Sequence, residues 1–427
     1  MKQPVAKKPA VAWVSGGSSA HPRRGKPWTL KRPAAVKKAQ QASKRGAALL
    51  TTRTSARMRP AAKVPYVPPH QQKESRSGHF QVRSSASKSE MNCDKLKDMT
   101  IRQLVMSMIK GRQLQAHKKC VHCKVGRLGK LKKIPRSKQL GQRCGSKKCQ
   151  KWTLPHANHP VLKTGWGHTH TPLKTQARIL HLAVWNVPQS MVPIIVDGIK
   201  HYKPDQIYKD WRALLSRYVK EKQKTISYGA EAGQPPDEVE VDGAVFRKTN
   251  LPDHEVLWQE MLGSKRRGDR ESLHLDSRDP SESVSKRAAN GRAVPPPETK
   301  KEWREMRDKR FGQNTLTHSD GAPAFTEQLP GSYRDKAVHG TSGGKRKPEY
   351  AKVVEHELTD GTKMKAQAGT QSLDGWWTHG KKACHGVKAQ DQTRVEDHVR
   401  AEQWRHWVGG KDRWAAAGDV FAWAAAQ

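Results

Sequence analysis

Four cysteines that lie close together in the sequence constrain the fold of this 427-residue chain more than any other feature. They follow the spacing C-x2-C-x20-C-x4-C and are Cys120, Cys123, Cys144 and Cys149. Two thiolate pairs separated by such a loop are typical of a tetrahedral zinc site with structural function. We therefore expect a zinc ribbon within residues 96–160, which would fold only with its metal.

Two alternatives to four thiolate ligands remain at this cluster. The cysteines could be buried without a metal, or His117 or His122 could replace one of them. The loop between the two pairs is basic, and we expect its cations to lower the thiol pKa values and help ligation. These cations are Lys124, Arg127, Lys130, Lys132, Lys133, Arg136 and Lys138.

The charge balance indicates a polyanionic partner. Lys and Arg number 81 against 39 Asp and Glu, giving a formal net charge of +42. A charge this large favours nucleic acid as the partner, and a soluble basic protein without a specific partner is the alternative. No run of 18 apolar residues is present, so we expect no membrane span and no membrane partner. With 34% hydrophobic residues, folded segments should alternate with disordered ones.

Residues 1–95 are expected to form a disordered basic tail. Within it, two basic pairs separated by a linker resemble a bipartite nuclear localisation signal, which predicts a nuclear import receptor as a partner and a nuclear location. The pairs are Lys31 with Arg32 and Lys44 with Arg45. A basic tail that binds DNA without specificity is the alternative.

Helices should follow the cysteine cluster. Apolar periodicity and helix-opening prolines predict three helices between residues 172 and 224, after an amphipathic helix over 100–110. A basic face on the third helix makes residues 161–228 compatible with a helix-turn-helix DNA-binding segment. The wall of an ordinary helical bundle is an equally good reading.

Residues 229–420 are predicted to form an α/β domain. Alternating Val residues predict a strand over 238–248, and 262–276 could hold one or two more. A helix is expected at 300–311, a strand at 314–320, and helices at 369–384 and 394–408. This order of elements is that of a mixed α/β fold.

Three carboxylates fall on separate elements of this segment. Asp242 is expected at the end of the first strand, Asp320 at the end of a later strand, and Asp374 in a helix. Three acids brought together could hold two Mg²⁺ or Mn²⁺ ions for in-line attack on a phosphodiester. Exposure on a solvated surface is the ordinary alternative for each acid.

These motifs carry a family resemblance. The zinc-ribbon cysteines, the helical segment and the stretches EVEVD, HSDGAPAF, GTQSLDGWW and AEQWRHWVGGKDRW resemble the ISXO-two-like insertion-sequence transposases over roughly residues 115–420. The resemblance implies an RNase H-like catalytic core with flanking helices, and a DDE-type site for DNA cleavage and strand transfer. It matches Asp242, Asp320 and Asp374 to the three metal-binding acids and Lys381 to a phosphate-contacting base.

Three positions depart from the family pattern. Gly243 stands where the family has Glu, Asp374 where it usually has Glu, and Phe325 where it has Tyr. We therefore carry two hypotheses: an active transposase, and a domesticated or decayed relative that binds DNA without catalysis. A third is a basic chromatin-associated protein without site preference. Synapsis of two DNA ends would make a homo-oligomer possible.

The tryptophans of the C-terminal part could serve the core or stack on unpaired bases. We expect most of them to line the core: Trp376, Trp377, Trp404, Trp407 and Trp414. Trp376 and Trp377 are adjacent on a predicted helix, so only one of the two is expected to face inward.

Overall fold

The computed structural model describes residues 91–135, 137, 139–163, 171–199, 203–251, 255–284, 294–337, 352–387 and 391–427. Nearly all of the expected basic tail 1–95 lies outside these residues, including Lys31, Arg32, Lys44 and Arg45. Within the described ranges no helix is long and apolar enough to cross a membrane.

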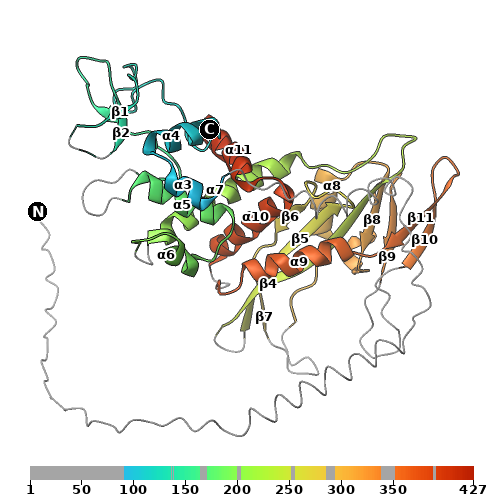
Figure 1. Ribbon diagram of the computed structural model, residues 1–427. Coiled ribbons are helices and arrows are strands. Elements are labelled where there is room, and N and C mark those ends of the chain that lie inside the picture. The colour runs from blue at the N-terminus through green and yellow to red at the C-terminus, as the bar shows by residue number, and fades with distance from the viewer. Residues whose placement is uncertain are drawn as a thin grey trace, which may run out of the picture. The chain divides into compact units, whose positions relative to one another are not determined.

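One group of helices gathers around a shared core (Figure 1). Its members are α3 (Cys93–Asp98), α4 (Ile101–Lys110), α5 (Leu173–Val184), α6 (Val192–Ile195), α7 (Lys203–Lys222), α10 (Gln392–Val408) and α11 (Arg413–Ala426). The predicted helix at 100–110 is confirmed, and Thr100 and Gln103 form a capping box at its start. Short 3₁₀ turns occupy Gln189–Met191 and Gln223–Thr225.

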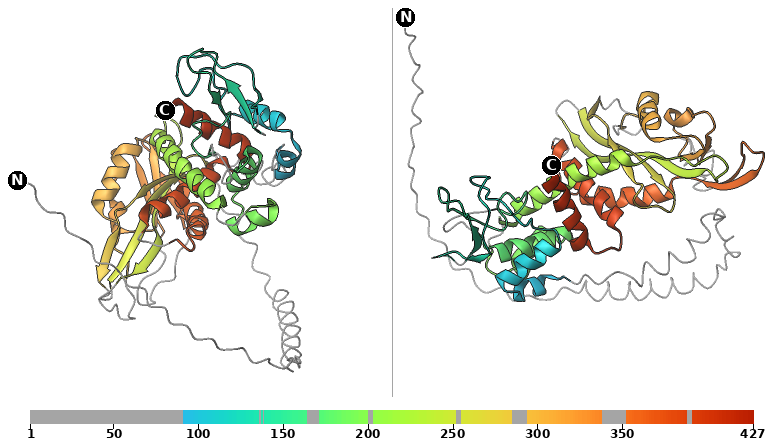
Figure 2. Two further views of the ribbon diagram at one scale, coloured as in Figure 1. Left: turned by 90° about the vertical axis from the view of Figure 1, so that its left-hand side faces the viewer. Right: turned by 90° about the horizontal axis from the view of Figure 1, so that it is seen from above.

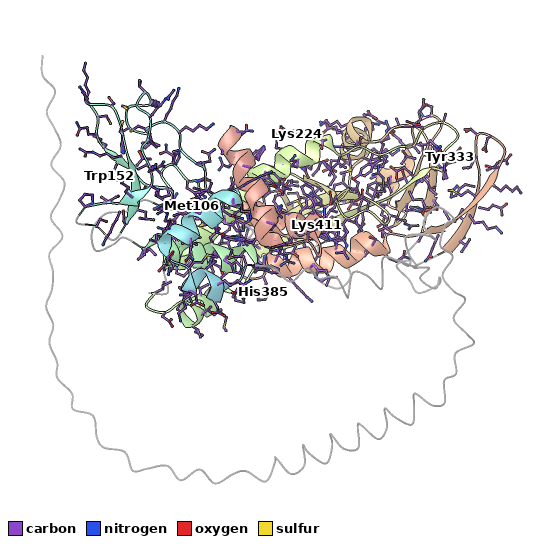
Figure 3. The ribbon with its side chains drawn as sticks, turned by 45° about the horizontal axis from the view of Figure 1, so that its top comes forward. Met106, Trp152, Lys224, Tyr333, His385 and Lys411 are labelled. Carbon is purple, nitrogen blue, oxygen red and sulfur yellow. The ribbon has the colours of Figure 1, made fainter. Side chains whose placement is uncertain are left out.

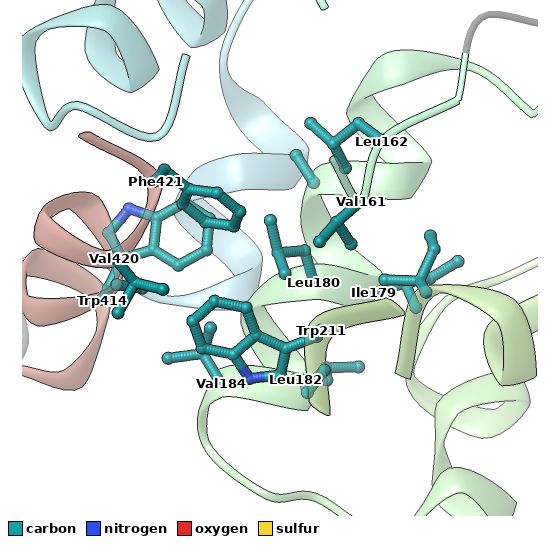
Figure 4. Close-up of a cluster of buried hydrophobic side chains, with 14 of the residues drawn as sticks. Val161, Leu162, Ile179, Leu180, Leu182, Val184, Trp211, Trp414, Val420 and Phe421 are labelled. Atoms are coloured by element: carbon teal, nitrogen blue, oxygen red, sulfur yellow. The ribbon is translucent and has the colours of Figure 1, made fainter. Parts of the chain in front are cut away.

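The core of this helical group joins segments that are far apart in the sequence. Figure 4 shows Trp211 of α7 beside residues of α5 and of α11, including Leu180 and Phe421. The ring centroids of Trp211 and Phe421 lie 5.3 Å apart. Helices on both sides of the expected boundary at residue 228 therefore share one core, and the segments 161–228 and 229–420 do not pack as separate units.

Helix α7 was expected to present a basic face to DNA. Instead it packs against α5, α10 and α11, and its Lys220 Nζ lies 2.7 Å from Glu396 of α10. Arg212 is also half-buried beneath neighbouring side chains. The helix-turn-helix prediction is not confirmed, because α7 packs as one member of a larger helical group, although its Lys209, Lys220 and Lys222 remain exposed.

The cysteine region forms a small antiparallel sheet. Its strands are β1 (Lys132–Lys133), β2 (Leu140–Arg143) and β3 (Trp152–Thr153). Positive φ angles at Lys124 (59°) and Gln150 (47°) turn the chain just after one cysteine of each pair. The two pairs are thereby placed on facing turns.

A mixed sheet lies at the centre of the remaining chain. Its order is β6-β5-β4-β8-β9, with β4 antiparallel to β5 and parallel to β8. The strands are β4 (Asp237–Asn250), β5 (Glu255–Arg266), β6 (His274–Ser277), β8 (Thr315–Ser319) and β9 (Tyr333–Lys336). The short strand β7 (Ser281–Val284) pairs with the first part of β5. The α/β prediction is confirmed at this level.

Helices cover both faces of the sheet, as Figure 2 shows from two sides. The alternating residues Val239 and Val241 pack with Trp303 of α8 (Lys300–Arg310) and with Phe325 of the 3₁₀ turn Pro323–Thr326. The opposite face, with Phe246, packs against α9 (Gln371–Ala383) and α10. A hairpin of β10 (Lys352–Glu357) and β11 (Lys363–Ala368) lies beside Leu316.

The tryptophan prediction is wrong at one point. Trp376 and Trp377 are both buried, each with 3% of its surface exposed. Helix α9 lies between the sheet and α10, and both tryptophan rings pack against Phe246 of the sheet and against each other. Trp404 and Trp414 are also buried, as expected, whereas Trp407 is half-buried.

Candidate metal centres

The four cysteines of the ribbon converge on one point. Their Sγ atoms all lie within 4.8 Å of one another, and no other such group of three or more His, Cys, Asp or Glu occurs in the described parts of the chain. Sγ of Cys120 lies 3.8 Å from that of Cys149, and Sγ of Cys123 lies 3.7 Å from that of Cys144. Four thiolates at these separations can hold one metal ion.

Backbone amides prepare the sulfurs for ligation. His122 N donates to Cys120 Sγ at 3.4 Å, and Gly126 N donates to Cys123 Sγ at 3.3 Å. Burial opposes ionisation of Cys120, but amide hydrogen bonds from Cys123 and His122 lower the pKa of its thiol to about 6. The expected cause was the charge of nearby lysines, and none of them contributes to the shift of Cys120. Cys144 accepts a hydrogen bond from Ser146 N, but burial and the neighbouring cysteines raise the pKa of its thiol to about 12.

The space inside the thiolate cluster excludes even a methyl group at Gly126. A Cβ atom there would lie 2.3 Å from Cys144 Sγ. His122, considered as a substitute ligand, instead places its Nε2 3.1 Å from the carbonyl oxygen of Trp152. The donor set is therefore four soft sulfurs in a tight cage, which suits zinc.

The surface around this cage is uniformly basic. Between residues 99 and 196 the sequence holds 19 Lys and Arg and no Asp or Glu. The described ribbon exposes Lys118, Lys119, Lys124, Arg127, Lys130, Lys132, Lys133, Arg143, Lys147, Lys148 and Lys151. None of these forms an ion pair with a carboxylate of the described residues, so all are available to an external polyanion.

The sheet register brings the first two acids beside each other. Glu240 of β4 pairs with His318 of the parallel strand β8, and two residues further along each strand stand Asp242 and Asp320. Strand β4 runs from Asp237 to Asn250, so Asp242 lies inside the strand. Its expected position at the end of the strand is wrong, whereas the predicted strand range 238–248 agrees closely with β4. Pairing with β5 up to Asn250 explains the longer strand.

Helix α9 brings the third acid to the same face. Its Trp377 Nε1 donates a hydrogen bond to Asp242 Oδ2 at 2.8 Å, and Asp374 lies one turn earlier on the helix. The Thr370 hydroxyl donates to Asp374 Oδ2 at 3.2 Å and orients that carboxylate. Glu240 Oε2 accepts from Leu373 N at 2.8 Å, which fixes the start of α9 on β4.

The acids interact electrostatically. Burial and, after it, the negative charge of Asp320 raise the pKa of Asp242 to about 8. The hydrogen bond from Trp377 lowers the pKa, whereas Asp374 and Glu298 add to the rise. A carboxyl group in this position is poorly stabilised as an anion unless a cation is bound nearby.

A glutamate that the sequence did not single out lies beside this site. A Cβ atom at Gly243 would lie 1.9 Å from Glu298 Oε1. Glu298 therefore fills the space of a side chain at position 243, where the resembled family has Glu. Its sequence context, after three prolines, gives no signal of this placement.

Two basic residues lie on the elements that carry or adjoin the acids. Lys381 is exposed on α9, seven residues after Asp374, which corresponds to about two helical turns. Arg334 of β9 donates from Nη2 to Ser319 Oγ at 3.3 Å, next to Asp320, whose charge acts on its guanidinium. Sequence reasoning missed Arg334, because nothing local distinguishes it from other arginines.

A buried ion-pair network supports the frame of the site. Arg267 contacts Glu238 at 3.2 Å and Glu240 at 2.9 Å, and it donates to the backbone just before α9. His318 Nδ1 lies 2.8 Å from Asp335 Oδ1 on the neighbouring strand. These contacts tie β4, β8, β9 and the start of α9 together.

The chain matches no protein-family model, no curated protein and no solved structure. The residues and their geometry are therefore the basis for a proposed function.

Proposed function

We propose that the protein binds DNA and cleaves and rejoins its phosphodiester bonds with a divalent metal ion, as a transposase-type enzyme. The observation that carries the proposal is the shared face of Asp242, Asp320 and Asp374, in which burial and mutual repulsion raise the pKa of Asp242. A mixed sheet covered by helices on both faces also suits the RNase H-like core that the sequence resembles.

In this proposal each residue has a distinct role. Asp242, Asp320 and Asp374 would hold Mg²⁺ or Mn²⁺, which, when bound, activates the attacking oxygen and stabilises the leaving oxygen. Trp377 orients Asp242 through its hydrogen bond, and Thr370 orients Asp374. Lys381 would contact a neighbouring phosphate.

The ribbon would supply DNA affinity. We propose that the four cysteines bind structural Zn²⁺ and hold a surface of exposed lysines and arginines against the phosphate backbone. Binding of this kind weakens steeply with salt. Nuclear import through Lys31, Arg32, Lys44 and Arg45 is part of the same proposal, since the DNA substrate would be nuclear.

A second candidate is a relative that binds DNA and does not cut it. Two observations favour it: Asp374 is one methylene shorter than the Glu of the family pattern, and among the described residues the three acids do not form a cluster as tight as that of the four cysteines. Both candidates share the ribbon and its basic surface, so DNA binding alone does not separate them.

The separating experiment is a cleavage assay with the zinc-loaded full-length chain, supercoiled plasmid and Mn²⁺. The active-enzyme proposal predicts nicked and linear products that disappear in Asp320→Asn and persist in Glu305→Gln, an exposed acid on α8. Salt-sensitive binding without products would favour the second candidate. Absence of both binding and cleavage would refute the proposal as a whole.

A further inference from the structure

A cavity lies where three helices and a turn of the sheet meet. Its volume is about 350 Å³, and α7, α10, α11 and the turn between β5 and β6 all contribute to its lining. This volume is in the range of small-ligand sites, roughly 300–1,000 Å³. The cavity is separate from both the cysteine cage and the three acids, and no step proposed above uses it.

Aromatic rings form much of its wall. Tyr218, Trp404 and Trp407 line it, and the half-buried Tyr218 and Trp407 leave part of their rings accessible. Trp407 Nε1 donates to the carbonyl oxygen of Leu273 at 3.0 Å, which fixes the orientation of its ring. Trp423 packs edge-on against Tyr218 at 5.4 Å between centroids and supports it from outside the cavity. Fixed rings suit a flat, aromatic ligand.

Charged groups stand at the edge of the same cavity. Lys222 Nζ lies 6.0 Å from the centroid of the Tyr218 ring, and Lys411, in the turn after α10, forms an ion pair with Glu271 of the turn before β6. Figure 3 labels Lys411 in this region. Asp419 of α11 adds a second carboxylate, one oxygen of which pairs with Arg112 at 3.1 Å. The edge therefore offers cations for a phosphate and carboxylate acceptors for amino groups.

We propose that this cavity, the interhelix cavity, binds one unpaired nucleotide of a DNA strand. The base would stack on Trp407 and Tyr218, its amino groups would donate to Glu271 or Asp419, and Lys222 would contact the adjacent phosphate. The proposal rests on the DNA binding proposed above and specifies which DNA is preferred: duplexes with an unpaired base. A free mononucleotide carries the same chemistry, and the test distinguishes it.

Two alanines on α11 provide matched variants. Ala416 lines the interhelix cavity and is half-buried, whereas the next residue, Ala415, is exposed and lies outside the lining. Ala416→Leu should fill part of the cavity, and Ala415→Leu adds the same atoms on the solvent side. Thermal unfolding of both variants verifies that the helical core remains folded.

The measurement uses two duplexes, one with a single bulged 2-aminopurine and one fully paired. We expect the wild-type chain to quench the bulged 2-aminopurine and to bind the bulged duplex about tenfold more tightly. Ala416→Leu should no longer quench the bulged 2-aminopurine or prefer the bulged duplex, but it should bind the paired duplex as tightly as the wild type. Ala415→Leu should retain both the quenching and the preference.

Three results would overturn the inference. If Ala416→Leu still prefers the bulged duplex, the unpaired base binds outside the interhelix cavity. If the wild-type chain binds both duplexes with equal affinity, the protein has no site for an unpaired base. Binding of adenosine monophosphate in the cavity without any preference for the bulge would assign it to free nucleotides. If the wild-type chain binds neither duplex, the proposed DNA binding itself is refuted.

Discussion

Trp377 of α9 donates its indole N–H to the Asp242 carboxylate of β4 across 2.8 Å. This single bond links the helix that carries Asp374 to the strand that carries Asp242, and it opposes the effect of burial on the Asp242 pKa. The indole ring meanwhile packs against Phe246, with centroids 5.6 Å apart. One side chain thus contributes to both the core and the candidate metal site.

Replacing that indole tests the bond. Trp377→Phe keeps most of the ring and removes the donor, so we expect the unfolding free energy at alkaline pH to fall by about 1–3 kcal/mol because a buried carboxylate loses a partner. Trp376→Phe is the control, since its buried Nε1 has no hydrogen-bond partner among the described residues. Denaturant unfolding measures both variants, and equal losses would contradict the role given to Trp377.

The raised pKa of Asp242 predicts a pH dependence in metal-free buffer. Its ordinary pKa is 3.8 and burial raises it to about 8, so the folded state binds more protons than the unfolded state between these values. Stability should therefore fall as pH rises through this window. Asp242→Asn removes the titrating group, so its stability relative to wild type should increase as the pH rises from about 5 to about 9. A parallel pH profile for the two proteins would be contrary evidence.

Because the cysteine cage is tight at Gly126, a larger residue at this position should weaken zinc binding. Gly126→Ala would place a Cβ atom 2.3 Å from Cys144 Sγ, so the sulfurs must move apart and zinc should be removed faster by a competing chelator. Gly129→Ala is the matched control, because the nearest atom to its Cβ would be the Arg143 carbonyl oxygen at 3.5 Å. Chelator-monitored zinc release compares the two, and equal rates would speak against a four-cysteine zinc site.

The buried ion pairs of Arg267 should stabilise the fold more than an exposed ion pair does. Arg267→Met leaves Glu238 and Glu240 buried without this cation, and we expect a loss of about 3–5 kcal/mol in unfolding free energy. Arg304→Met breaks an exposed pair with Glu327 and should cost much less, because solvent screens such a pair. Urea unfolding measures both, and similar costs would mean that the network does not hold the site.

Local signals predicted the elements that local chemistry determines. The predicted helices at 100–110 and 300–311 begin within a residue of the observed starts of α4 and α8, which capping boxes at Thr100 and Thr299 stabilise. Cysteine spacing likewise predicts the thiolate cluster, since two short turns create it.

Long-range packing determined what the sequence did not reveal. Strand β4 extends to Asn250 because β5 pairs with it, and Trp376 and Trp377 are both buried because α9 is covered on two sides. Helix α11 was not expected, although Asp412 caps it and its core contacts include α5 and α7. Glu298 reaches Gly243 through a fold contact with no counterpart in local sequence.

The most direct test of the central claim is to measure Mn²⁺ binding to the zinc-loaded chain by isothermal titration calorimetry or electron paramagnetic resonance. The account predicts at least one Mn²⁺ per chain in the wild type and in Glu305→Gln, with binding lost in both Asp242→Asn and Asp320→Asn. Mn²⁺ binding that survives both substitutions, or that is absent from the wild type, would contradict it.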